Sequence, residues 1–85
     1  MKQVLMYTGD YCPHCKSAKA LLESKNVAIK EIDISRDSNK RIEMQERTGG
    51  AKTIPQIFIG DHYIGGNAEL QEANRNGELD KLLTS

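Results

Sequence analysis

The chain has two cysteines, Cys12 and Cys15, in the segment Tyr11-Cys12-Pro13-His14-Cys15. A Cys-x-x-Cys pair can cycle between a dithiol and a disulfide, and redox chemistry is the interpretation we favour. If a helix begins just after Cys12, its free backbone N–H groups and its dipole stabilise an anionic sulfur there. In such motifs the pKa of the thiol falls from about 8.5 to roughly 3.5–7.5. The spacing therefore predicts that Cys12 attacks, and that the more buried Cys15, one helical turn further on, resolves.

Three other interpretations of the pair stay open. A structural disulfide is typical of oxidising compartments, but the N-terminus shows no secretory signal. A zinc site needs about four ligands, whereas the chain offers two cysteines, two histidines and no second Cys-x-x-Cys pair. Two inert thiols at this spacing are the third alternative. We therefore predict no metal site.

His14 has two interpretations that the sequence does not separate. A protonated imidazole near Cys12 would favour the thiolate and increase the oxidising power of the pair. A solvent-exposed residue at a tolerant position explains it equally well. The same holds for Lys16 and Lys19, which either add positive charge near the site or form a solvated helix face.

Two further segments could bind a substrate. Pro55 opens an expected strand and has no N–H, which suits an edge or a bend. If the Ile54-Pro55 bond were cis, the Ile54 backbone could pair with an extended peptide. Gly65-Gly66 precedes Asn67 at an expected helix start, where backbone can approach a ligand and a carboxylate is favoured. The alternative there is a plain turn followed by an N-cap.

The composition indicates one ordinary globular domain over residues 1–85. Hydrophobic residues make up 38% and charged residues 28%. The net charge is zero, with 12 basic and 12 acidic residues, so nothing calls for nucleic acid or an anionic membrane. The longest apolar runs are too short to span a bilayer. Without a visible signal segment, the expected location is the cytoplasm.

The elements that must position these residues begin with a strand over 3–8, a short apolar run that suits a buried parallel strand. A helix follows from Pro13, which fits the first helical position. Asn26 is expected to end it in a left-handed conformation. The β-branched segment 27–34 is expected to be a second strand. The apolar face of the first helix should contain Cys15, Ala18, Leu21 and Leu22.

A second helix is expected after Ser35 or Asp37, ending before Gly49-Gly50, with Ile42 and Met44 as its thin apolar face. A strand over 54–59 and a return strand over 62–64 are joined by Gly60-Asp61, a two-residue hairpin signal.

Gly65-Gly66 should end the return strand, and Asn67 should cap a third helix. A last apolar turn around Gly77 should dock on the core through Leu79, Leu82 and Leu83. The predicted order is β-α-β-α-β-β-α. This is an α/β protein with a mixed four-stranded sheet flanked by helices, the layout of the thioredoxin-like fold.

Together, the Cys-x-x-Cys segment, Thr53–Ile59 and Ile64-Gly65-Gly66 resemble the glutaredoxin family, most closely its small bacterial dithiol members. The likeness covers nearly the whole chain. It implies a glutathione-disulfide oxidoreductase that reduces protein–glutathione mixed disulfides and protein disulfides. Glutathione would be a co-substrate, with no tightly bound cofactor. Protein partners would carry disulfides or glutathione, ribonucleotide reductase being one candidate, and the chain would act as a monomer.

The resemblance also implies residue roles. Cys12 would carry glutathione as a mixed disulfide and Cys15 would resolve protein disulfides. Pro55 would be cis, and Ile54 would pair its backbone with the cysteine of glutathione. The full set implied to bind glutathione is Tyr11, Pro13, His14, Lys52, Thr53, Ile54, Pro55, Gly66, Asn67, Ala68 and Glu69.

The chain departs from the family pattern at three places. Gly9 stands where many members have a lysine that holds the glycyl carboxylate of glutathione, and Lys52 is the candidate replacement. Asn67-Ala68 stands where many members have acidic residues, which leaves Glu69 as the candidate partner of the glutathione amine. His14 replaces the usual tyrosine.

Three other functions stay open. The first is a dithiol donor recharged by thioredoxin reductase, which the glycine at position 9 keeps open. The second is an iron–sulfur cluster carrier in which glutathione and Cys12 from two chains hold the cluster. The third is an interaction domain without redox activity.

Overall fold

The chain opens with a strand–helix–strand unit. In the computed structural model, which describes residues 2–84, β1 covers Val4–Thr8, α1 covers Pro13–Ser24 and β2 covers Ile29–Asp33. The two strands are parallel, with Tyr7 opposite Ile32. The helix between them is the crossover that a parallel pair requires, because the chain must return to the end of the sheet where β1 began before β2 can run in the same direction.

A second helix and a hairpin complete the sheet. The remaining elements are α2 (Ser38–Arg47), β3 (Gln56–Ile59), β4 (His62–Gly65), α3 (Asn67–Arg75) and α4 (Glu78–Thr84). The strand order is β2-β1-β3-β4, and β3 is antiparallel to both of its neighbours. The predicted mixed four-stranded sheet of a thioredoxin-like α/β fold is confirmed. Among residues 2–84, no helix is both long enough and apolar enough to cross a membrane.

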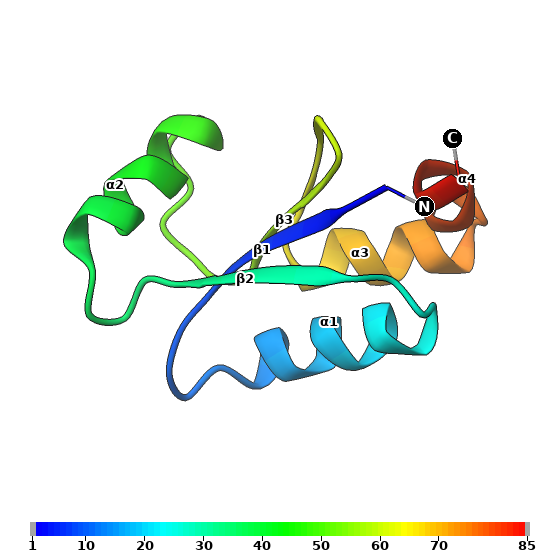
Figure 1. The fold of residues 1–85 in the computed structure, drawn as a ribbon, viewed down its shortest axis with the longest axis horizontal. Coiled ribbons are helices and arrows are strands. Elements are labelled where there is room, and N and C mark those ends of the chain that lie inside the picture. The colour runs from blue at the N-terminus through cyan, green and yellow to red at the C-terminus, as the bar shows by residue number, and fades with distance from the viewer. Residues whose placement is uncertain (1, 85) are drawn as a thin grey trace.

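The two faces of the sheet carry different layers. Figure 1 shows α1 and α3 on one side of the sheet and α2 on the other. The larger core lies between the sheet and the α1–α3–α4 side, and the smaller core lies under α2. Alternate residues of each strand supply the two cores, as the two-residue period of a strand requires. The larger core consists of Val4, Met6, Ala18, Leu22, Ile57, Ile59, Leu70, Ala73, Leu79 and Leu83.

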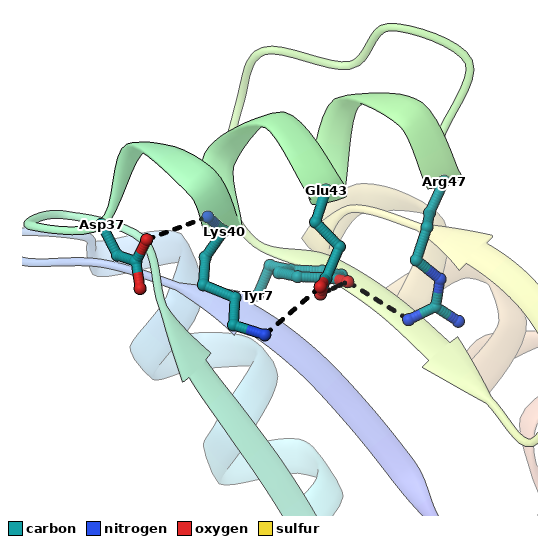
Figure 2. A network of polar contacts seen from close by, with 5 residues as sticks. All are labelled: Tyr7, Asp37, Lys40, Glu43 and Arg47. Carbon is teal, nitrogen blue, oxygen red and sulfur yellow. Dashed lines mark hydrogen bonds and ion pairs between the residues drawn. The ribbon is translucent and has the colours of Figure 1, made fainter.

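Polar contacts around Tyr7 connect helix α2 to the sheet (Figure 2). The buried Tyr7 hydroxyl donates to Glu43 at 2.6 Å and accepts from Arg47 at 3.2 Å. Lys40 pairs with Glu43 at 3.2 Å, and the Asp37 side chain caps the helix by accepting from the Lys40 backbone N–H. These contacts supplement an apolar face on which Met44 is the one fully buried residue of α2.

Two predictions in this region are wrong. Ile42 was expected on the buried face of α2, but its side chain is 51% exposed, and only Met44 of the expected pair is buried. The strand predicted over 54–59 begins instead at Gln56. Pro55 has no N–H to add to the ladder, so regular pairing starts one residue later.

The start of α3 also differs from the prediction. Asn67 is the first helical residue, and the N-cap is Gly66, whose N–H donates to Glu69 Oε1 at 2.7 Å. Gly65, expected to follow the return strand, is the last residue of β4. The reciprocal half of a capping box thus comes from the glutamate, because glycine has no side chain to offer.

Candidate active site

Cys12 lies at the N-terminus of α1 and caps it. Its Sγ accepts a hydrogen bond from the backbone N–H of Cys15 at 3.1 Å, and Pro13 takes the first helical position, as predicted. Cys12 and Cys15 are joined by a disulfide, with their Cα atoms 5.2 Å apart. Cys12 is 9% exposed and Cys15 is 5% exposed, so the predicted order of burial is confirmed by a small margin.

The chemistry available here follows from the helix terminus. When the disulfide is reduced, the sulfur of Cys12 sits where backbone N–H groups have no partners within the helix, and where the helix dipole favours negative charge. Both effects favour the thiolate over the thiol at such a position. Cys15 is positioned to close the disulfide again without movement of the backbone.

The backbone around Pro55 lies beside this sulfur. Cys12 Sγ is 3.7 Å from the carbonyl oxygen of Ile54, although the two residues are 42 positions apart in sequence. The Ile54–Pro55 peptide bond is cis, as the family resemblance implied. The structure therefore brings together the two segments that the sequence analysis had singled out separately.

A groove of about 290 Å³ runs from this point to the start of α3. One wall is the segment before β3 and the other is the first turn of α3. Eight of the eleven residues expected to bind glutathione line it: His14, Thr53, Ile54, Pro55, Gly66, Asn67, Ala68 and Glu69. Residues of the 53–55 and 66–69 segments thus form one concave surface beside the redox pair.

The other three expected residues lie elsewhere. Tyr11 is fully exposed and lines a second, smaller groove of about 160 Å³ on another side of the cysteine pair. Pro13 and Lys52 are exposed and line neither groove. In the smaller groove Lys19 pairs with Glu31 at 2.9 Å, and this hydrogen bond raises the pKa of Lys19.

A side chain at position 9, in the loop before Cys12, would require the side chains of Ser35 and Ile54 to shift. A Cβ added to Gly9 would lie 2.7 Å from Ser35 Oγ and 2.8 Å from Ile54 Cδ1. Ser35 Oγ accepts from the Asp10 backbone N–H at 2.6 Å, and Asp10 also pairs with Arg36 at 3.2 Å. Gly9 stands where many family members have a lysine, and in this chain Ser35 and Ile54 occupy the space next to it.

One residue of the site was missed by the sequence analysis. Gln56 is buried behind the groove, and its side-chain amide donates to the carbonyl of Thr53 at 2.9 Å and to its hydroxyl at 3.2 Å. The Tyr63 hydroxyl donates to Gln56 Oε1. The available signal was a glutamine opening an otherwise apolar strand, a position where a polar side chain needs buried partners.

Among residues 2–84, no group of three or more histidine, cysteine, aspartate or glutamate side chains is arranged to hold a metal ion.

Known proteins are similar to this chain in sequence and in fold. The family model described as Glutaredoxin matches residues 4–64. Glutaredoxin 3 of Escherichia coli strain K12 is 46% identical over 83 residues, which are 98% of this chain and 99% of that protein. The solution structure of glutaredoxin from Brucella melitensis has a TM-score of 0.84 and 47% identity, and the match covers 98% of this chain and 89% of that one. The crystal structure of a buckwheat glutaredoxin–glutathione complex has a TM-score of 0.85 and 27% identity, with coverages of 95% and 76%.

Proposed function

This chain belongs to the glutaredoxin family and is a thiol–disulfide oxidoreductase, and from that premise we propose that glutathione is the thiol it works with. Its proposed substrates are protein–glutathione mixed disulfides and, by a second route, protein disulfides. The proposal takes residues 1–85 as one domain that acts as a monomer in the cytoplasm, where a dithiol is kept reduced.

The observation that carries the proposal is the groove beside Cys12. It combines the Thr53–Pro55 segment with the N-terminus of α3, which starts at Asn67. An extended tripeptide with a free carboxylate needs both, because its backbone can pair in β fashion and its carboxylate is favoured at a helix start. A structural neighbour, the buckwheat protein, has been solved in complex with glutathione, which supports the same ligand here.

The proposed first step is a sulfur exchange at Cys12. The Cys12 thiolate attacks the glutathionyl sulfur of the mixed disulfide, a new Cys12–glutathione disulfide forms, and the substrate protein leaves as a thiolate that takes up a proton. A second glutathione thiolate then attacks the glutathionyl sulfur on Cys12 and leaves as glutathione disulfide. A low pKa helps in both steps, because it increases the thiolate fraction of Cys12 and makes it a good leaving group.

The second proposed route uses both cysteines. Cys12 forms a mixed disulfide with a protein, and the Cys15 thiolate attacks the Cys12 sulfur, forms the Cys12–Cys15 disulfide and releases the reduced protein. Two glutathione molecules then reduce that disulfide and leave as glutathione disulfide. Ribonucleotide reductase is one proposed partner of this route. The 5.2 Å between the two Cα atoms supports it, since that separation lies within the range of disulfides.

We assign the ligand contacts as follows. The backbone of Ile54 pairs with the cysteine of glutathione, and the N–H groups at Asn67 and Ala68 receive the γ-glutamyl carboxylate. Glu69 faces the glutathione amine. Lys52 is the candidate for the glycyl carboxylate. Tyr11 and Pro13 would contact the part of the substrate nearest the sulfur. His14 would contact glutathione from the wall of the groove that it lines.

The decisive experiment is mass spectrometry of the Cys15→Ser variant after exposure to glutathione disulfide. We expect one glutathione adduct on Cys12, because the resolving thiol that would displace it is gone. No adduct at neutral pH would overturn the proposal. Turnover with glutathione and glutathione reductase, compared with thioredoxin reductase alone, separates the proposed enzyme from a thioredoxin-reductase-dependent donor. A brown colour after anaerobic purification would instead favour an iron–sulfur carrier.

A further inference from the structure

Gln56 is a buried amide at the back of the glutathione groove. Among residues 2–84 it is the one buried side chain that carries an amide or a charge, with 4% of its surface exposed. A buried amide lowers stability unless its donors and acceptor are satisfied. Both ends of this one are satisfied, by Thr53 on one side and Tyr63 on the other. Its contacts therefore join the groove wall to the hairpin of β3 and β4.

The partners of Gln56 define its orientation. A backbone carbonyl only accepts hydrogen bonds, so the side-chain nitrogen must face the Thr53 oxygen, which it does at 2.9 Å. The remaining oxygen then needs a donor, which is the hydroxyl of Tyr63. Burial, together with the charge of Glu69, raises the pKa of Tyr63, so this phenol stays protonated and keeps donating.

Tyr63 is itself held in place by the core under α2. Its ring packs on Phe58 with 5.0 Å between centroids, and the guanidinium of Arg47 lies 4.3 Å from the centroid of the same Phe58 ring. A contact series thus runs from α2 through Phe58, Tyr63 and Gln56 to Thr53. The final contact is on the groove wall itself.

We propose that Gln56 is a positioning residue for glutathione. Its amide holds the carbonyl and hydroxyl of Thr53, and this keeps the Thr53–Pro55 wall in the conformation that the extended tripeptide pairs with. The inference rests on the proposed function and extends it from the groove surface to the residue behind it. Gln56 does not touch the ligand, so its effect passes through Thr53.

This role has a kinetic signature that a general loss of stability lacks. The hydrogen bond from Cys15 N–H to Cys12 Sγ lies within the first turn of α1 and does not involve Gln56. Loosening the groove wall should therefore weaken binding of the substrate without changing the reactivity of Cys12. The loss should appear in KM for the glutathionyl substrate and leave kcat nearly unchanged.

The test uses Gln56→Met, which keeps the length of the side chain and removes its hydrogen bonds, and Tyr63→Phe, which keeps the ring and removes the donor to Gln56. The matched control is Gln45→Met on α2, a half-buried glutamine that lines neither groove. The substrate is a mixed disulfide of glutathione and a short cysteine peptide. We expect Gln56→Met to raise KM about five- to tenfold and Tyr63→Phe about two- to threefold, with kcat within about twofold of wild type.

Two further measurements separate the outcomes. The pH profile of Cys12 alkylation by iodoacetamide should be the same in wild type and both variants, since the thiolate is stabilised by α1. If wild type turns over the mixed disulfide and both folded variants keep the KM of Gln45→Met, the positioning role is wrong while the proposed function stands. If wild type itself shows no glutathione-dependent turnover, the proposed function fails. Should Gln56→Met not fold, Tyr63→Phe decides alone, and an unchanged KM there overturns the inference.

Discussion

The backbone N–H of Cys15 donates to the sulfur of Cys12 at 3.1 Å, so the residue that closes the disulfide also binds the sulfur it reacts with. One turn of helix accounts for both relationships. A residue three positions after an N-cap has its N–H directed at the capping atom, and its side chain lies on the same side of the helix. The same contact that stabilises an anionic Cys12 thus keeps Cys15 within reach of it.

The two cysteines should differ sharply when each is replaced by serine. Cys12→Ser should abolish all activity, because the attacking sulfur is lost. Cys15→Ser should retain deglutathionylation and lose reduction of protein disulfides, because only the second route needs a resolving thiol. Steady-state assays on a glutathionylated peptide and on a protein disulfide check this. An active Cys12→Ser with an inactive Cys15→Ser would reverse the assignment.

Tyr7→Phe should destabilise the fold by about 1–2 kcal/mol, because Glu43 and Arg47 each lose a hydrogen bond to its buried hydroxyl. The aromatic ring, which packs edge-on against Phe58, remains. Urea unfolding measures the change. Tyr11→Phe is the matched control, since Tyr11 is fully exposed and should unfold at the wild-type midpoint. Equal midpoints for the two variants would show that the network under α2 contributes nothing.

The charge of Glu43 should stabilise the protein in a pH-dependent way. Its pKa is lowered by the hydrogen bond from Tyr7 and then by Lys40. A lowered pKa in the folded state means that the stabilisation is present above the ordinary glutamate pKa and is lost as the pH falls through the lowered value. The difference in Tm between wild type and Glu43→Gln should therefore be larger at about pH 7 than at about pH 3. A constant difference across this range would contradict the assignment.

Two substitutions at Glu69 should separate its capping role from its proposed role in binding. Glu69→Ala removes the acceptor of the Gly66 N–H and should lower stability by about 0.5–2 kcal/mol. Glu69→Gln keeps an acceptor and should unfold close to wild type. Both remove the charge proposed to face the glutathione amine, so both should raise KM about two- to threefold. If Glu69→Gln keeps the wild-type KM, Glu69 caps α3 and has no role in binding glutathione.

Gly9→Ala should cost about 1–3 kcal/mol, because the added Cβ would collide with Ser35 Oγ and Ile54 Cδ1. Removing one obstacle should reduce that cost. In a Ser35→Ala background the same change should therefore be less destabilising, and a double-mutant cycle in urea measures the coupling. Strict additivity of the two changes would show that Ser35 does not restrict position 9.

Local signals in the sequence were sufficient to predict how the redox pair is positioned on its helix. The position of Cys12 as an N-cap, Pro13 in the first turn and Asn26 in a left-handed conformation all follow from interactions within four residues along the chain. The order of strands and helices was predictable for the same reason, since hydrophobic periodicity is also local. The N-cap of α3 was predicted one residue too late although its signal is also local: the cap is Gly66, and the side chain of Glu69, three residues later, reaches back to it.

Local patterns did not determine which segments meet, although the family resemblance implied that Cys12, Ile54 and Asn67 contact the same ligand. Ile54 and Cys12 become neighbours because β1 pairs with β3 and not with β4, and no local pattern encodes that choice. The same packing buries Gln56 at the back of the groove and leaves Ile42 exposed. Sequence by itself therefore determined the reactive residues and the elements that carry them. Their assembly into one groove, and the buried amide behind it, depended on contacts between residues distant along the chain, whose energies are set by packing of the whole fold.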